Sequence, residues 1–243
     1  MSHVQLWLVL GFVSLLASLF IGFSILLIVV AMFEKHPIRS LTPLAPSDVP
    51  RLSPYAEVMN EQVREAGFTF LGHFAPSQGG MYKTITTAWL SPDRTTRVLV
   101  TGGTTVGIKT RRTTLTSRTS DDIRLLTTDE FDESDLTGRT DQSVLLRADF
   151  FELWQAHQFR LSQAPGLLQH FDTDNLPEQR RREIEKHARR LAELRYARYT
   201  DPAQTAWRYT PLGAFVYWHR GFLRQLSEAR NQQDRSRLPR VGT

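Results

Sequence analysis

Thirty consecutive residues, from Val4 to Phe33, carry no charge. About 20 apolar residues in a helix, each rising 1.5 Å, are enough to cross the hydrocarbon core of a bilayer. Thirty residues exceed one span but are too few for two spans and a turn. The sequence therefore predicts one transmembrane helix over residues 4–33, with the spare length taken up by tilt or by extension past the lipid.

The charges that flank this helix predict its orientation. Lys35, Arg39 and Arg51 follow it, whereas residues 1–3 contain no Lys or Arg. Because basic residues favour the cytoplasmic side, we expect a single-pass protein of the cell membrane whose C-terminal part is cytoplasmic. A cleaved signal peptide is the alternative, since residues 29–31 loosely resemble a cleavage site. That alternative lacks a basic leading region, and the apolar stretch is about twice the usual 7–15 residues.

Residues 34–52 are predicted to form a proline-rich linker. Prolines stand at positions 37, 43, 46 and 50, and this density favours an extended, fairly stiff spacer over a helix.

Residues 53–163 are predicted to form an α+β domain. Ser53 and Pro54 suit the start of a helix over residues 53–66, and Gly67 suits its end. Short runs rich in β-branched and aromatic residues follow over residues 68–128. Turn signals separate these runs, including Gly102-Gly103, and predict an antiparallel β-meander of four to five strands. An apolar stripe at helical spacing then predicts a helix over residues 143–161 that packs on the sheet.

Residues 164–230 are predicted to be a C-terminal helical region. A charged helix is expected from Pro177 to about Tyr199, and an apolar one from Pro211 onward. The polar residues 231–243 are predicted to be a disordered tail. Charge is segregated along the chain: residues 121–174 have a net charge of −8 and residues 175–243 a net charge of +8. The two stretches are therefore expected to attract each other or partners of opposite sign.

Several motifs approach a known chemistry without matching it. The stretch from Gly102 to Lys109 resembles a phosphate-binding loop, in which a lysine directly follows the second glycine of the motif and a helix begins there. Here Ile108 separates Gly107 from Lys109, and a strand is expected, so a hairpin is favoured. The acidic loop 129–135 lacks the order of a calcium-binding EF-hand and is expected to be solvated. The chain contains no Cys, which excludes thiolate chemistry and disulfides.

Isolated histidines and carboxylates offer two weaker sets. His170, Asp172 and Asp174 would share a face if extended, and Glu183 and His187 would share a helical face, but neither set has a recognised metal spacing. We expect surface polar residues at both.

One histidine and one aromatic helix have competing interpretations. His157 lies on an apolar stripe, where a hydrogen-bonded core histidine is more frequent than a catalytic base. In the last helix, Trp218 with Arg220 and Arg224 would suit contact with anionic lipid, although completion of the domain core is the more ordinary role.

These features together predict a membrane-anchored, non-enzymatic binding or accessory domain. No catalytic residue, cofactor site or metal site is predicted. These features are compatible with a protein partner. Nucleic acid is not expected, because glutamates lower the net positive charge of the basic helix. The alternative is a membrane-anchored hydrolase with a site built from scattered polar residues. A cluster of buried titratable groups in a cleft, with strongly shifted pKa values, would favour the hydrolase.

Overall fold

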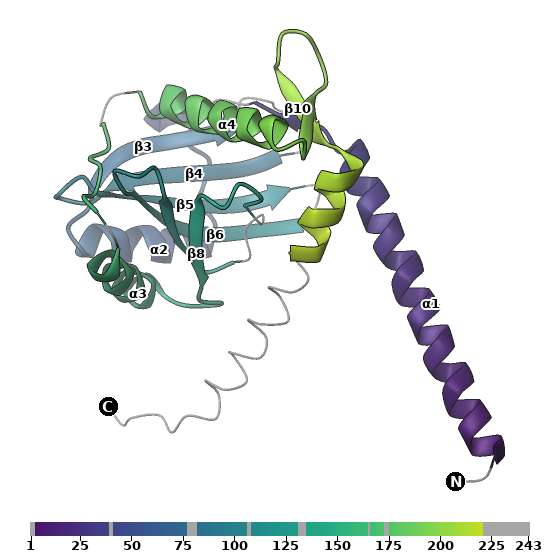
Figure 1. The fold of residues 1–243 in the computed structure, drawn as a ribbon. Helices are drawn as coiled ribbons and strands as arrows, with labels where there is room; N and C mark the ends of the chain where they lie inside the picture. Colours follow the sequence, from purple (N-terminus) through teal and green to yellow (C-terminus); the bar gives the residue numbers. More distant parts are fainter. Residues whose placement is uncertain are drawn as a thin grey trace, which may run out of the picture. The chain divides into compact units, whose positions relative to one another are not determined.

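The computed structural model describes residues 3–38, 41–76, 82–105, 108–130, 135–164, 166–172 and 175–220. The chain divides into two compact units. Unit 1 comprises Met1–Pro37 and Ala188–Thr243, and unit 2 comprises Ile38–His187. The fold is α+β, with one apolar N-terminal helix and a mixed, mostly antiparallel sheet (Figure 1).

Unit 1 begins with α1 (His3–Phe33). Within the described residues, α1 is the one helix that is long and apolar enough to cross a membrane, by length and composition. Its large side chains are mostly exposed, including Phe12 and Phe23. Ser24 is a buried exception, and Phe20 packs against Trp218 with 6.0 Å between ring centroids.

A small antiparallel sheet completes unit 1. It consists of β1 (His36–Pro37), β10 (Ala206–Tyr209) and β9 (Ala197–Tyr199), in that order. The His36 ring stacks on Trp207 at 4.3 Å. Residues 211–220 are helical, and Gly213 is required at their start because a Cβ there would collide with the Tyr196 carbonyl.

The region predicted to be helical over residues 164–230 is therefore only partly so. α4 (Leu176–Glu193) ends six residues before the predicted end near Tyr199. Arg195 has a φ of 59°, and the N–H of Tyr196 donates to the carbonyl of Leu191, so the chain leaves the helix and enters β9. The predicted tail, residues 231–243, lies outside the described residues.

Unit 2 contains a seven-stranded sheet in the order β2-β3-β4-β5-β6-β7-β8. The strands are β2 (Leu41–Pro43), β3 (Thr69–Pro76), β4 (Tyr82–Leu90), β5 (Thr96–Thr105), β6 (Ile108–Arg118), β7 (Arg124–Thr128) and β8 (Thr140–Val144). Neighbouring strands are antiparallel, except that β7 and β8 are parallel. The five strands β3 to β7 form the predicted antiparallel meander within residues 68–128, but the whole sheet has seven strands, more than the four to five predicted.

The two additional strands come from segments predicted to be something else. β2, as well as the short 3-10 helix η1 (Pro46–Asp48), lies inside the predicted linker 34–52. Proline is tolerated in β2 because it is an edge strand. β8 occupies the start of the helix predicted over residues 143–161. The observed helix α3 (Phe150–Gln163) begins later, where Asp149 and Glu152 form a capping box.

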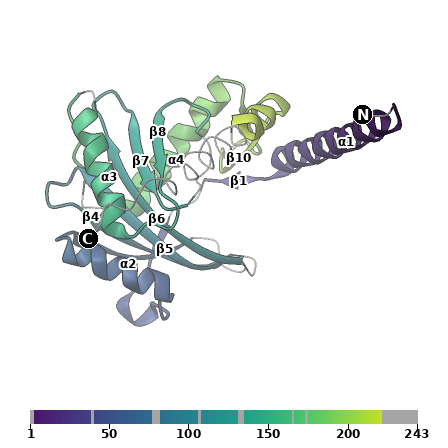
Figure 2. The same ribbon diagram turned by 90° about the horizontal axis from the view of Figure 1, so that it is seen from below.

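Helices cover both faces of this sheet (Figures 1 and 2). α2 (Pro54–Glu65) and α3 lie on one face, over the main apolar core. Ser53 caps α2 and Pro54 opens it, as predicted. On the opposite face, Leu176 at the start of α4 packs with Phe74 and Ala88.

The glycine pair Gly102-Gly103 was predicted as a turn, and this was wrong. Both residues lie inside β5, where they pair with β4 and β6. Gly102 lies beneath the start of α2: a Cβ there would collide with Ser53 Oγ and stand 3.0 Å from Ala56 Cβ. The glycine therefore lets the helix approach the sheet closely, and it does not serve to reverse the chain.

We expect Gly102→Ala to destabilise the fold by about 1–3 kcal/mol, because the new methyl group overpacks the contact between α2 and β5. Adding Ser53→Gly removes the colliding hydroxyl while lowering the capping energy by only a few tenths of a kcal/mol. Urea unfolding of the full chain in mild detergent, for both single variants and the double variant, measures the coupling. Additive effects of the two substitutions would contradict this packing account.

Candidate functional site

A buried arginine on the α4 face of the sheet forms the base of the candidate site. Arg97 belongs to β5, where Val98 and Val100 point into the core beneath α2 and α3. Because strand side chains alternate between faces, Arg97 points to the opposite face. Its side chain is only 1% exposed, and its guanidinium lies 4.9 Å from the centre of the Phe171 ring.

Three arginines converge on a single carboxylate of α4. Arg97 Nη2 donates to both oxygens of Glu183 at 3.0 Å. Arg118 Nη2 from β6 lies 3.2 Å from Oε1, and Arg180 Nη1 lies 2.9 Å from Oε2. Burial by itself would raise the pKa of Glu183, but Arg97, Arg180 and Arg118 outweigh it and hold that pKa well below its usual range.

A second ion pair extends this cluster. Arg118 Nη1 lies 3.7 Å from Asp122 Oδ1, and Lys186 Nζ of α4 lies 2.7 Å from Asp122 Oδ2. Four cations, at positions 97, 118, 180 and 186, therefore face the two carboxylates of Asp122 and Glu183. We call these six side chains the arginine cluster.

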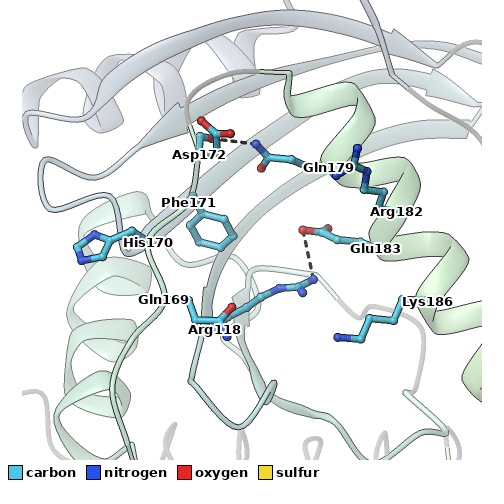
Figure 3. Close-up of a pocket in the computed structure, with 9 residues that line it drawn as sticks. All are labelled: Arg118, Gln169, His170, Phe171, Asp172, Gln179, Arg182, Glu183 and Lys186. Atoms are coloured by element: carbon cyan, nitrogen blue, oxygen red, sulfur yellow. Dashed lines mark hydrogen bonds and ion pairs between the residues drawn. The ribbon is translucent and has the colours of Figure 1, made fainter.

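The cluster borders a pocket of about 290 Å³ (Figure 3). Arg118 forms one wall, residues 169–172 form a second, and α4 closes the third with Gln179, Arg182, Glu183 and Lys186. The backbone fixes the second wall: the N–H of Gln169 donates to the carbonyl of Arg118, and the N–H of Phe171 donates to the carbonyl of Arg94, both at 2.8 Å.

This arrangement suits the binding of an anion better than acid–base catalysis. A general acid or base works best with a pKa near the working pH. Glu183, which is less exposed than Asp172, the other carboxylate of the pocket, is instead held ionised by three guanidinium groups. Three basic residues of the lining, Arg118, Arg182 and Lys186, outnumber its two carboxylates, Asp172 and Glu183. Of the three, Arg182 also pairs with Glu178 at 3.2 Å.

Glu183 and His187 were weighed as a metal set and expected to be surface polar residues, and for Glu183 this expectation was wrong. Only 13% of the Glu183 side chain is exposed and it joins the arginine cluster, whereas His187 Nδ1 lies 3.8 Å from Asp135 Oδ1. His170 and Asp172 line the pocket, and the His170 Nδ1 is 2.9 Å from the carbonyl of Asp93. Asp174 lies outside the described residues.

Other candidate motifs take up structural positions. No group of three or more His, Asp or Glu side chains within the described ranges is placed to hold a metal ion. The sequence resembling a phosphate-binding loop is part of the β5–β6 pair, and residues 106–107 at its tip are not among the described ones. Trp218 and Arg220 lie in the last described helix, whereas Arg224 falls beyond the described residues.

His157 is a hydrogen-bonded core histidine, as predicted. It is completely buried, with Nε2 3.0 Å from Ser117 Oγ and Nδ1 2.9 Å from Thr127 Oγ1. Burial, reinforced by the nearby charge of Arg160, lowers the pKa of His157 to about 3. The imidazole is therefore neutral at physiological pH, and it links β6 and β7 to α3.

The structure describes residues 129, 130 and 135 of the acidic loop, and two of these three are less solvated than predicted. Asp129 is buried: it accepts hydrogen bonds from the Tyr55 hydroxyl and, at 2.7 Å, from the N–H of Thr113. Burial and the adjacent Asp129 carboxylate raise the pKa of Tyr55 above its usual range. Asp135 is half-buried as a residue, and only 6% of its side chain is exposed. No sequence motif indicated that Tyr55 of α2 would meet Asp129.

No protein-family model, curated protein or solved structure matches the chain.

Neutral His157 predicts a distinct pH dependence. Between pH 6.5 and about pH 3 the unfolded chain binds a proton at this residue that the folded chain does not accept. The free energy of unfolding should therefore fall by about 1.4 kcal/mol per pH unit as the pH drops through this window. His157→Gln removes the titrating group, so its unfolding free energy should change less between pH 6 and pH 4.

Urea titrations of the full chain in mild detergent at pH 7, 6, 5 and 4 measure this slope. Leu153→Ala, a buried substitution on the same helix, is the control, because it lowers stability without removing a titrating group. Equal slopes for His157→Gln and the unaltered chain would overturn the assignment.

Proposed function

We propose that the chain is a single-pass membrane-anchored protein whose remaining part binds a partner and catalyses no reaction. The proposal of a membrane anchor rests on α1, a 31-residue helix with no charged residue between positions 4 and 33. Phe12, Leu19 and Phe23 are each about 60% exposed. Apolar surface of this extent is stable in hydrocarbon and unfavourable in water.

The side of the membrane follows from the flanking charge. Lys35, Arg39 and Arg51 follow the anchor, and we propose that they keep this end, and with it unit 2, in the cytoplasm of the cell. The binding role is supported by the pocket, because its basic lining residues and a Glu183 carboxylate whose pKa the arginines lower suit charge attraction better than proton transfer.

The last described helix of unit 1 supports a contact with lipid. Trp218 packs on Phe20 of α1, while Leu212 and Phe215 are at least half exposed on the same helix. Arg220 is exposed at its end, and Arg224 follows in the sequence. An apolar stripe beside basic residues is typical of a helix that lies at an anionic membrane surface, and we propose this position for residues 211–220.

Extraction of membranes with alkaline carbonate tests the anchor. We expect the full chain to remain in the membrane pellet. Leu15→Arg with Leu19→Arg should release it, because each arginine near the centre of a spanning helix opposes insertion by about 2.5–3.5 kcal/mol. Val58→Arg, on the exposed side of α2, is the control and should remain in the pellet. Release of the unaltered chain would refute the anchor.

Spin labelling tests the lipid contact, and it is straightforward because the chain has no Cys. In nanodiscs containing anionic lipid, a label on Phe215→Cys should be accessible to dissolved oxygen and shielded from a water-soluble nickel complex. A label on Phe159→Cys, an exposed residue of α3, is the control for a water-facing site.

Adding Arg220→Glu and Arg224→Glu should expose the label at position 215 to nickel, because the charge attraction becomes repulsion. If the labels at positions 215 and 159 were equally accessible to nickel in the unaltered background, residues 211–220 would not contact lipid.

A further inference from the structure

The arginine cluster carries more positive charge than its own carboxylates neutralise. Arg97, Arg118 and Arg180 share the single carboxylate of Glu183, and the remaining acid, Asp122, already pairs with Lys186 at 2.7 Å. Four cations against two carboxylates leave a net positive charge. This charge lies partly within the protein interior, where it is screened far less than at the surface.

Part of this charge also lacks hydrogen-bond acceptors. Nε and Nη1 of Arg97, as well as Nε of Arg118, are buried and have no acceptor among the described residues. Arg97 is fully buried; its Nη2 donates to Glu183, and the face of the Phe171 ring lies 4.9 Å from the guanidinium carbon, but a ring face accepts no hydrogen bond from Nε or Nη1. Burial of a charge is unfavourable unless it is paired, so the surroundings of Arg97 and Arg118 favour additional negative charge nearby.

The pocket is the place where such charge can enter. Arg118 belongs both to the cluster and to the pocket wall, and it is 20% exposed. Arg182 and Lys186 project from the same face of α4, with 74% and 57% of their side chains exposed. Gln169 adds a neutral amide to the lining, while Gln179 Nε2 donates to the carbonyl of Asp172 at 3.1 Å. An anion in this space would meet donors from β6, from the segment before α4 and from α4 itself.

The size and donor set of the pocket indicate the class of anion. A volume of about 290 Å³ is at the lower end for ligand sites and suits one small group. Guanidinium groups match the oxygens of phosphate through paired N–H donors, and a lysine adds a point charge. We propose that this pocket binds a phosphate group, whether as a free anion or as the head of a larger molecule such as an anionic lipid.

This inference rests on the binding role proposed above, but it does not depend on the anchor. The carbonate extraction can therefore succeed while phosphate binding fails, and the reverse is equally possible. The two failures are distinguishable.

Isothermal titration of the full chain in a nonionic detergent, with sodium phosphate as the probe, tests the proposal. We expect saturable binding that weakens as sodium chloride is raised. Lys186→Gln should weaken it about tenfold, through loss of one charge-assisted hydrogen bond. Arg64→Gln, a substitution of an exposed arginine on the α2 face of the sheet, should leave the affinity unchanged.

Arg118→Gln should weaken binding more strongly than Lys186→Gln, because a guanidinium can hold phosphate through paired N–H donors whereas a lysine supplies a point charge. Circular dichroism shows whether Arg118→Gln folds. If it does not fold, Lys186→Gln still tests the proposal, because Lys186 is exposed and its substitution does not disturb the core. A second titration uses phosphatidic acid mixed into the detergent micelles. Binding of phosphatidic acid but not of free phosphate, again weakened by Lys186→Gln, assigns the site to a lipid phosphate.

Two results would overturn the proposal. One is the absence of saturable binding for both probes. The other is binding that Lys186→Gln and Arg64→Gln weaken equally, because such binding would reflect only the overall charge of the chain.

Discussion

The packing of α4 on the sheet depends on the ion pairs that the Glu183 carboxylate forms. Arg97 reaches it from β5, Arg118 from β6 and Arg180 from α4 itself. Without this carboxylate, three guanidinium groups would be left close together, one of them fully buried. Removing one member of a buried ion pair typically destabilises a protein by about 3–5 kcal/mol. The first turns of α4 are therefore held to the sheet mainly by charge, with a small apolar contact at Leu176.

The opposite face of the same sheet is held together differently. There α2 and α3 pack through a continuous apolar core that includes Val63, Val98 and Phe150. Two buried polar contacts at its margin fix the register of the helices on the strands: Tyr55 with Asp129, and His157 with Ser117 and Thr127. Each has its hydrogen bonds satisfied, so it adds specificity without leaving a buried polar atom unpaired. Apolar packing thus builds one face, while the charged face borders the pocket.

The sequence predicted elements that depend on neighbours along the chain. The cap at Ser53, the apolar stripe of α3 and the uncharged stretch of α1 were recognisable because spacing and capping are local properties. Prediction from the sequence failed where a segment distant along the chain decides which element forms. β8 forms because β7 offers a parallel edge, and Gly102 lies within a strand because α2 crosses directly above it.

The candidate site was beyond the reach of the sequence for the same reason. Arg97, Arg118 and Glu183 are separated by 21 to 86 residues and match no motif, although an arginine inside a β-branched strand such as β5 is an unusual feature. Only the antiparallel pairing of β5 with β6, together with the placement of α4 across them, brings their side chains together. Residues 121–174 and 175–243 carry opposite net charges, and Asp122 and Lys186 form an ion pair between them, but Arg97 and Arg118 lie outside both stretches.

The most direct test of this account is the titration of Glu183 itself. The full chain, with its glutamate carboxyl groups labelled with ¹³C and solubilised in detergent micelles, can be followed by NMR as the pH is lowered, and Glu183→Gln identifies the resonance by its loss. The account predicts that Glu183 remains ionised well below the usual glutamate pKa of 4.5, for as long as the chain stays folded. Protonation at or above 4.5 would contradict it, because three guanidinium groups around one carboxylate cannot coexist with an ordinary pKa.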